Sequence, residues 1–251
     1  MKKLYKLLIA IVLIAYFIYL VVSRVPAAYG VAALHSAMPN LWLTGVSGTI
    51  WSGTAQASQV DIEEFSIPLG LVEWELNAFS LVYLRPCLTF TASQPSQAIS
   101  GNLCQQLGGN SYVRDVNVDG SMALINPLLP VEVQGRGSLQ VVRGVFDKAD
   151  VKKLEAQLSW QNARFLAIDN WIALGSYAAK LTENGEGGIN AEVFDLQGPI
   201  KLNGNAGWHI ASGWTVDATV TPQAGTPQQI VEGLQLIGEE VSAGTYQLIW
   251  P

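Results

Sequence analysis

Residues 153–160 read Lys-Leu-Glu-Ala-Gln-Leu-Ser-Trp, and polar and apolar side chains alternate strictly along this stretch. Successive side chains of a β-strand point to opposite faces of its sheet. The alternation therefore predicts a strand with one face against a core and the other in water. It is the clearest secondary-structure signal in the 251 residues and sets the interpretation of the rest of the chain.

The same two-residue period recurs on both sides of this stretch. Turn-forming residues separate the periodic segments, and the Asn184-Gly185 pair is a strong hairpin signal. Strands that follow one another without crossover helices form antiparallel sheets. We therefore expect a mainly β protein with a large, curled, mostly antiparallel sheet and few short helices, one of them over 227–236. The further strands are expected around 41–57, 71–76, 81–83, 116–124, 131–141, 177–181, 189–193, 200–210, 214–220 and 246–250.

The N-terminus has a different pattern. Lys2, Lys3 and Lys6 precede the apolar run 7–22, which contains no charge, Gly or Pro, and Arg24 follows it. A helix over this run predicts a single transmembrane anchor within residues 1–24, with the N-terminus in the cytoplasm. The alternative is a secretory signal peptide that is removed. Both readings place the bulk of the chain outside the cytoplasm.

After the anchor we expect a juxtamembrane helix within residues 25–40, which Pro39 ends, and a periplasmic β domain over 41–251. All 20 acidic residues but only ten of the 14 basic ones follow Arg24, so this part carries a net charge of about −10. Nucleic-acid binding requires a basic surface, so an acidic domain argues against it. Charged residues are only 14% of the chain, which indicates a neutral, polar sheet surface.

The two cysteines, Cys87 and Cys104, lie in two expected strands that a turn at 93–97 connects. If Ser93 pairs with Ala98, the register places Cys87 opposite Cys104, where a disulfide can form. An oxidising compartment favours that bond. The alternative is a pair of buried free thiols.

The sequence offers little that could carry out catalysis. His35 and His209 have no neighbouring ligands at metal spacing, and no nucleophile elbow, dinucleotide loop or Cys-x-x-Cys motif occurs. The acidic group at 61–64 reads as a solvated surface, although a carboxylate pair across a cleft would suit a hydrolase. We expect no catalytic residue, metal or cofactor, and hence no enzyme.

One short block points to a family. Residues 47–53 read Ser-Gly-Thr-Ile-Trp-Ser-Gly, and with the N-terminal run, Val72-Glu73-Trp74 and Gly244-Thr245-Tyr246 the chain resembles the protein N family of bacterial type II secretion systems. In this block Gly48, Trp51 and Gly53 form the family motif, for which the resemblance implies a structural role. It implies an inner-membrane protein with a periplasmic body and no catalytic residues. The Gly-Thr-x-Trp pattern is also similar to AsmA-like proteins, whose curled sheets are implicated in lipid transport.

The sequence and the resemblance together suggest two functions. The first is a non-enzymatic scaffold that contacts other inner-membrane secretion proteins, by an exposed sheet edge for example. The second is a carrier of lipid or another apolar ligand in a β-groove whose concave face stays unfilled.

Overall fold

A computed structural model describes residues 2–62, 65–148, 150–167 and 169–250, without the side chains of residues 2–4, 7, 8 and 15. Two helices, α1 (Lys2–Ser23) and α2 (Ala27–Ala37), precede the sheet. Three short helices interrupt or cover it: α3 (Ala78–Val82), the 3-10 helix η1 (Met122–Leu128) and α4 (Gln228–Ile237). The strands are β1 (Leu41–Gly48), β2 (Ser52–Ile62), β3 (Phe65–Asn77), β4 (Cys87–Gln94), β5 (Gln97–Gln105), β6 (Ser111–Ser121), β7 (Val133–Asp147), β8 (Asp150–Ala167), β9 (Asn170–Glu183), β10 (Ile189–Gln197), β11 (Ile200–His209), β12 (Gly213–Pro222), β13 (Glu239–Ser242) and β14 (Thr245–Trp250).

The described strands form one 14-stranded sheet in which each strand from β1 to β11 pairs with the next one in the chain. The order changes only at the end, where β14 pairs with β12 and β13 becomes the outer strand. Every pairing between the described strands is antiparallel. The predicted fold class, mainly β with a large antiparallel sheet, is confirmed.

The register separates the two faces of the sheet. The central row of one face holds apolar residues and one glycine, in strand order Val46, Ala55, Val72, Ala92, Ile99, Val118, Leu139, Leu158, Ala179, Val193, Gly204, Ala218 and Leu248. The neighbouring row, on the opposite face, is polar: Ser47, Thr54, Glu73, Thr91, Ser100, Asn117, Gln140, Gln157, Lys180, Glu192, Asn205 and Asp217. The alternation at 153–160 thus extends from β1 to β12, while the residue opposite Asp217 in β14 is the apolar Ile249.

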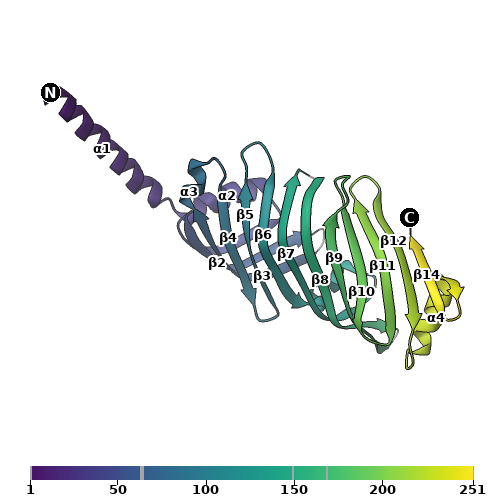
Figure 1. Cartoon of the computed structure of the whole chain (residues 1–251). Helices are drawn as coiled ribbons and strands as arrows, with labels where there is room; N and C mark the ends of the chain where they lie inside the picture. Colours follow the sequence, from purple (N-terminus) through teal and green to yellow (C-terminus); the bar gives the residue numbers. More distant parts are fainter. Residues whose placement is uncertain (1, 63–64, 149, 168, 251) are drawn as a thin grey trace.

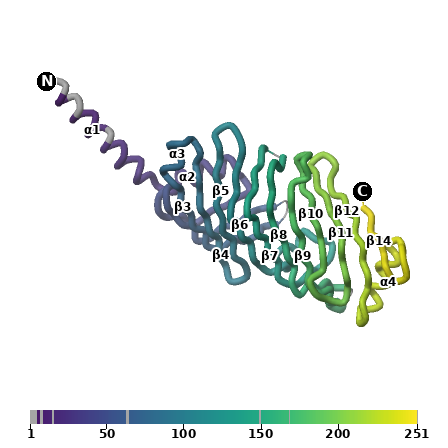
Figure 2. Tube along the Cα trace, viewed as in Figure 1, coloured from purple at the N-terminus to yellow at the C-terminus, as the bar shows by residue number. Residues whose placement is uncertain are grey.

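The sheet is strongly curled (Figure 1), and β2 and β3 cross behind the middle strands. Register shifts between neighbouring strands contribute to this curvature, because a bulge increases local twist. Two of them coincide with left-handed backbone at Asp115 in β6 and Asn162 in β8. The tube view of the same orientation shows α1 projecting away from one end of the sheet and α4 at the other (Figure 2).

Among the described elements, no second layer covers the apolar face from end to end. Helix α4 packs Ile230 and Leu234 into one buried cluster with Ile172, Val220 and Tyr246. A second cluster surrounds Val151, Leu154 and Ala156. Among the described residues, no large side chain is fully buried. The curled sheet therefore forms a groove whose apolar lining is only partly covered.

Two segments that the sequence predicts as strand are helical in the structure. The prediction of a strand around Leu81 and Tyr83 is wrong, because this segment belongs to the short helix α3 and the residue after it. Asn77 caps that helix by accepting a hydrogen bond from Phe79 N (3.0 Å). The strand expected over 116–124 ends at Ser121, which caps η1 through a 3.3 Å hydrogen bond from Ala123 N. In both places a local side-chain cap overrides the apolar alternation.

The helix expected within 25–40 is present as α2, and the one expected over 227–236 is present as α4. Helix α1 covers the N-terminal apolar run. Within the described part of the chain, no helix combines the length and the apolar character needed to cross a membrane. The transmembrane anchor within residues 1–24 therefore stays a prediction.

Cys87 and Cys104 occupy directly opposite positions on β4 and β5, in the register that the Ser93–Ala98 pairing predicts. The structure joins them by a disulfide and leaves no described cysteine free. The bond closes a loop that contains one hairpin. It lies at the end of β4 that follows α3, so it fixes the position at which this helical turn rejoins the sheet.

Removing the disulfide is expected to destabilise the domain by about 3 kcal/mol, the value that chain entropy gives for a loop of this size. The measurement is urea unfolding of the Cys87→Ser, Cys104→Ser double variant. Reductant should lower the stability of the wild type by a similar amount and leave the variant unchanged. Equal unfolding midpoints for oxidised wild type and variant would contradict the prediction.

Candidate functional site

The motif residues Gly48, Trp51 and Gly53 lie at the junction between the N-terminal helices and the sheet, in the turn from β1 to β2. The Trp51 indole Nε1 donates a hydrogen bond to the Val22 carbonyl at the end of α1 (2.8 Å). Next to it, Ile50 N donates to Val25 O (3.0 Å). The turn therefore bonds one carbonyl in the last turn of α1 and one just after the helix, and so ties the helix to the sheet.

Both glycines of the motif occupy positions that have no room for a side chain. Gly48 has φ of +90°, which favours glycine. Gly53 is buried beneath the ring of Trp74, and an added Cβ would lie 2.9 Å from Trp74 Cε2 and 2.7 Å from Ser47 O. At Gly53 the missing side chain lets Trp74 and the β1 backbone pack closely, and a structural role for the motif stays a prediction.

A second candidate site is an open cavity of about 600 Å³ on the apolar face. Two tryptophans, Trp208 and Trp214, lie side by side in it with ring centroids 6.3 Å apart. Its other lining residues come from β8 to β11: Leu158, Ser159, Trp160, Leu174, Tyr177, Ala178, Ala179, Leu181, Ile189, Ala191, Val193, Leu202, Ala206 and Gly207. We call it the apolar cavity.

One indole and one phenol at the apolar cavity are bound to backbone carbonyls. Trp160 Nε1 donates to Gln134 O (3.0 Å), and the Tyr177 hydroxyl donates to Leu174 O (2.7 Å). Burial, with a smaller effect of the Asp195 charge, raises the pKa of Tyr177 to about 12. The phenol therefore stays neutral at physiological pH, and the cavity offers apolar contact without a charge.

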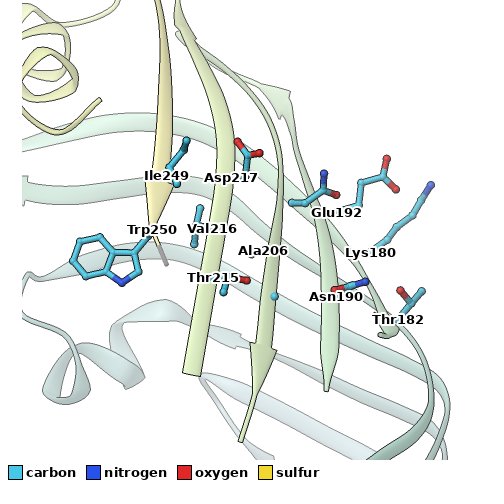
Figure 3. A pocket seen from close by; sticks show the side chains of 12 residues that line it. Lys180, Thr182, Asn190, Glu192, Ala206, Thr215, Val216, Asp217, Ile249 and Trp250 are labelled. Atoms are coloured by element: carbon cyan, nitrogen blue, oxygen red, sulfur yellow. The ribbon is translucent and has the colours of Figure 1, made fainter. Parts of the chain in front are cut away.

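The opposite face carries an open depression of about 610 Å³ over β9 to β14. Figure 3 shows Lys180, Glu192 and Asp217 among its lining side chains. Glu192 and Asp217 lie two strands apart because Asn205 pairs with both of them. Asp217 accepts a hydrogen bond from Gln247 (2.9 Å), and both carboxylates are exposed. This arrangement is typical of a solvated sheet face, since a catalytic pair of carboxylates faces a substrate across a cleft.

The remaining catalytic candidates lie apart from one another. His35 stacks against Trp42 in the α2–β1 region, and His209 Nε2 contacts the Glu186 carbonyl at a hairpin end. Asp61 is bound to Ser66 and Gln59, while Glu63 and Glu64 lie outside the described residues. Across the described segments no cluster of His, Cys, Asp and Glu could hold a metal ion.

The fold and the two candidate sites define a class of protein: a single curled β-sheet that follows an N-terminal helix, with an apolar groove on one face and a solvated polar surface on the other. A sequence model of the family "Type II secretion system (T2SS), protein N" matches residues 39–249. The chain therefore belongs to the type II secretion system protein N family. It is 28% identical over 249 residues to "Type II secretion system protein N" of Aeromonas hydrophila, which covers 96% of each chain. No solved structure matches it.

Gly53→Val is expected to destabilise the domain by about 2 kcal/mol or more, because the added atoms would have to displace the Trp74 ring or the β1 backbone. Thermal or urea unfolding measures the change. The control is Gly233→Ala in α4, where an added Cβ has nothing within 4 Å. That variant should unfold at or slightly above the wild-type midpoint, since alanine favours a helix. A Gly53→Val variant as stable as the control would refute the packing argument.

Proposed function

We propose that this protein is a non-enzymatic, inner-membrane accessory component of a type II secretion system. In this proposal α1 is the anchor, the N-terminus is cytoplasmic, and the β domain stands in the periplasm, where it contacts other inner-membrane proteins of the system. Membership of the protein N family supports the assignment to the secretion system. The scaffold role is supported by the two outer strands, β1 and β13, each of which pairs with only one other described strand.

The side chains of α1 support the anchor. Val12, Phe17 and Tyr19 are each about two-thirds exposed, and the other apolar residues of the run whose side chains are described are also exposed. Large apolar surfaces of this kind mark interaction sites, and a bilayer would cover them. The lysines before the run and the scarcity of basic residues after it favour a cytoplasmic N-terminus.

The two edges of the sheet differ in a way that singles out β1. An edge strand can pair with a strand from a partner, and charged residues on an edge discourage such pairing. β13 has only four residues, of which two are Glu239 and Glu240. β1 has eight residues and no charge or proline, and its Trp42 is 47% exposed. Strand β1 is therefore the edge that suits strand addition by a partner.

A charge on this edge is expected to weaken assembly. The variant Trp42→Lys places a lysine on β1. After crosslinking in native membranes, we expect about fivefold less of the other inner-membrane secretion proteins to be recovered with this variant. That decrease corresponds to the loss of a contact worth about 1 kcal/mol. The control is Ile210→Lys, at an exposed hairpin position far from this edge. Equal recovery with both variants would contradict a partner on β1.

The apolar cavity supports a second candidate function, a carrier or binder of lipid in the groove. Its 600 Å³ falls within the range of small-molecule pockets, and its apolar lining and neutral Tyr177 suit an acyl chain. Because no described layer covers this surface, an apolar ligand would remove it from water. This candidate is compatible with a scaffold role, since the cavity and the β1 edge are different surfaces.

Filling the cavity separates the two functions. Ala179 is 6% exposed and lies in the cavity lining, so Ala179→Trp would occupy part of the space. If the cavity carries lipid, mass spectrometry of the purified protein should find bound lipid in the wild type and in the control Ala98→Trp, on an exposed position, but not in Ala179→Trp. Absence of lipid from all three proteins would reject the carrier function and leave the scaffold.

A further inference from the structure

An exposed apolar patch surrounds α3. Phe79 and Val82 of this short helix are 81% and 75% exposed, and Tyr83 and Leu84 directly after it are 82% and 63% exposed. Leu107, in the β5–β6 loop that contacts this segment through a hydrogen bond to Leu84 O, is 65% exposed. We call these five residues the α3 patch. Apolar side chains gathered at a loop end in this way mark an interaction surface.

A cavity with two arginines lies beside the α3 patch. It measures about 320 Å³, and Arg85 and Arg114 line it together with Tyr83, Tyr112 and the Cys87–Cys104 disulfide. The Arg85 guanidinium stacks over the ring of Tyr112, with Cζ 3.9 Å from the centroid. The Arg85 Nε is buried and has no hydrogen-bond partner among the described residues. We call this the arginine cavity.

The arginine cavity lacks the acidic groups that neutralise arginines elsewhere on this sheet. Arg136 is paired with Asp119, and Arg143 with Glu155 (2.8 Å). Neither Arg85 nor Arg114 is paired with a carboxylate among the described residues. The sequence contains no acidic residue between Glu75 and Asp115, in a chain with 20 of them. A planar guanidinium with free donors suits a phosphate group.

Hydrogen bonds place the patch close to the end of α1. Trp51 donates to Val22 at that end, and the carbonyl of the same Trp51 accepts from Leu76 N (2.7 Å). Leu76 is the second-last residue of β3, and α3 follows at once. Figure 1 shows α3 on the rim of the sheet near the point where α1 leaves it. A membrane that holds α1 would therefore lie next to the patch.

The rim changes character further along the sheet. The turns after β7 and β9 lie at the same strand ends and carry Asp147, Asp150, Glu183 and Glu186. Anionic headgroups would repel these turns. Charges more than about 8 Å apart are largely screened at physiological ionic strength, so the arginine cavity can attract such a surface despite the acidic domain.

We propose that the α3 patch and the arginine cavity together form a membrane-docking surface that binds anionic phospholipid. The phosphate of a headgroup enters the arginine cavity and accepts hydrogen bonds from Arg85 and Arg114. Phe79, Val82, Tyr83 and Leu84 insert at the interface, where aromatic side chains are favoured. The surface holds the sheet at a fixed angle to the membrane. This inference rests on the proposed membrane placement of α1.

The test uses the full chain with a fluorescent reporter. Because both native cysteines are in the disulfide, Phe79→Cys supplies a single free thiol for a polarity-sensitive dye. The labelled protein is reconstituted into vesicles of phosphatidylcholine alone or with phosphatidylglycerol. We expect a blue shift and stronger emission when phosphatidylglycerol is present. The same dye at Ile210→Cys, an exposed position on the acidic side of the rim, should show neither change.

Charge variants test the arginine cavity. Arg114 is exposed, so the Arg114→Gln variant is expected to fold normally. It should need about fivefold more phosphatidylglycerol for the half-maximal dye response, because it loses one basic contact with the anionic surface. Arg85→Gln should act in the same direction, and Arg164→Gln, on an exposed position of β8, should have no effect. A response that is the same on neutral and anionic vesicles, or unchanged in Arg114→Gln, would overturn the proposal.

Vesicle flotation separates this inference from the proposed anchor. If the full chain floats with vesicles while the dye at position 79 stays in water, the anchor stands and the docking surface is rejected. If the chain does not float, the proposed placement of α1 fails first. Flotation together with a dye response that depends on phosphatidylglycerol supports both.

Discussion

The constraint on which the structure depends is the register of the 14 strands. Each strand is offset from its neighbour so that apolar residues meet apolar residues on one face and polar residues meet polar ones on the other. Because the side-chain period of a strand is two, a slip of one residue would move a whole strand's apolar side chains into water. Hairpin connections and the Cys87–Cys104 bond fix the pairing of neighbouring strands. The left-handed backbone at Asp115 and Asn162 lies at bulges, where the sheet bends while its strands stay paired.

From that register follow the surfaces that bear on function. Curling a one-layer sheet around its apolar face creates a groove, and α4 closes only one end of it. The groove contains the apolar cavity, the rim carries the α3 patch and the arginine cavity, and β1 is one outer strand of the sheet. The motif at Gly48, Trp51 and Gly53 joins these parts, since Trp51 links the end of α1 to β3. In the functions proposed above, these separate surfaces contact a membrane and a protein partner at the same time.

Much of the fold could be predicted from the sequence, because its signals are local. Alternation at 153–160 and its repeats identify the strands, and the turn at Ser93 to Ala98 fixes the pairing of the cysteines. The helical turns at α3 and η1 could not be found in this way. Leu81 and Tyr83 alternate like a strand, and only the cap at Asn77 reveals the helix.

The candidate sites were harder to predict because they depend on curvature and long-range pairing. Trp160 and Trp208 are far apart in the chain and meet only when β8 to β11 are assembled in register. Arg85 and Arg114 converge because α3 folds back to the end of β4, which no local pattern indicates.

The most direct test of the register is a comparison of two cysteine pairs. The hydroxyl oxygens of Ser138 and Ser159 lie 2.8 Å apart across β7 and β8. Oxidation of Ser138→Cys, Ser159→Cys should give a second disulfide in nearly every molecule. The pair Ser138→Cys, Leu158→Cys, shifted by one residue to the other face, should keep both thiols free. Disulfide formation in the shifted pair, or free thiols in the first, would contradict the sheet on which the account is built.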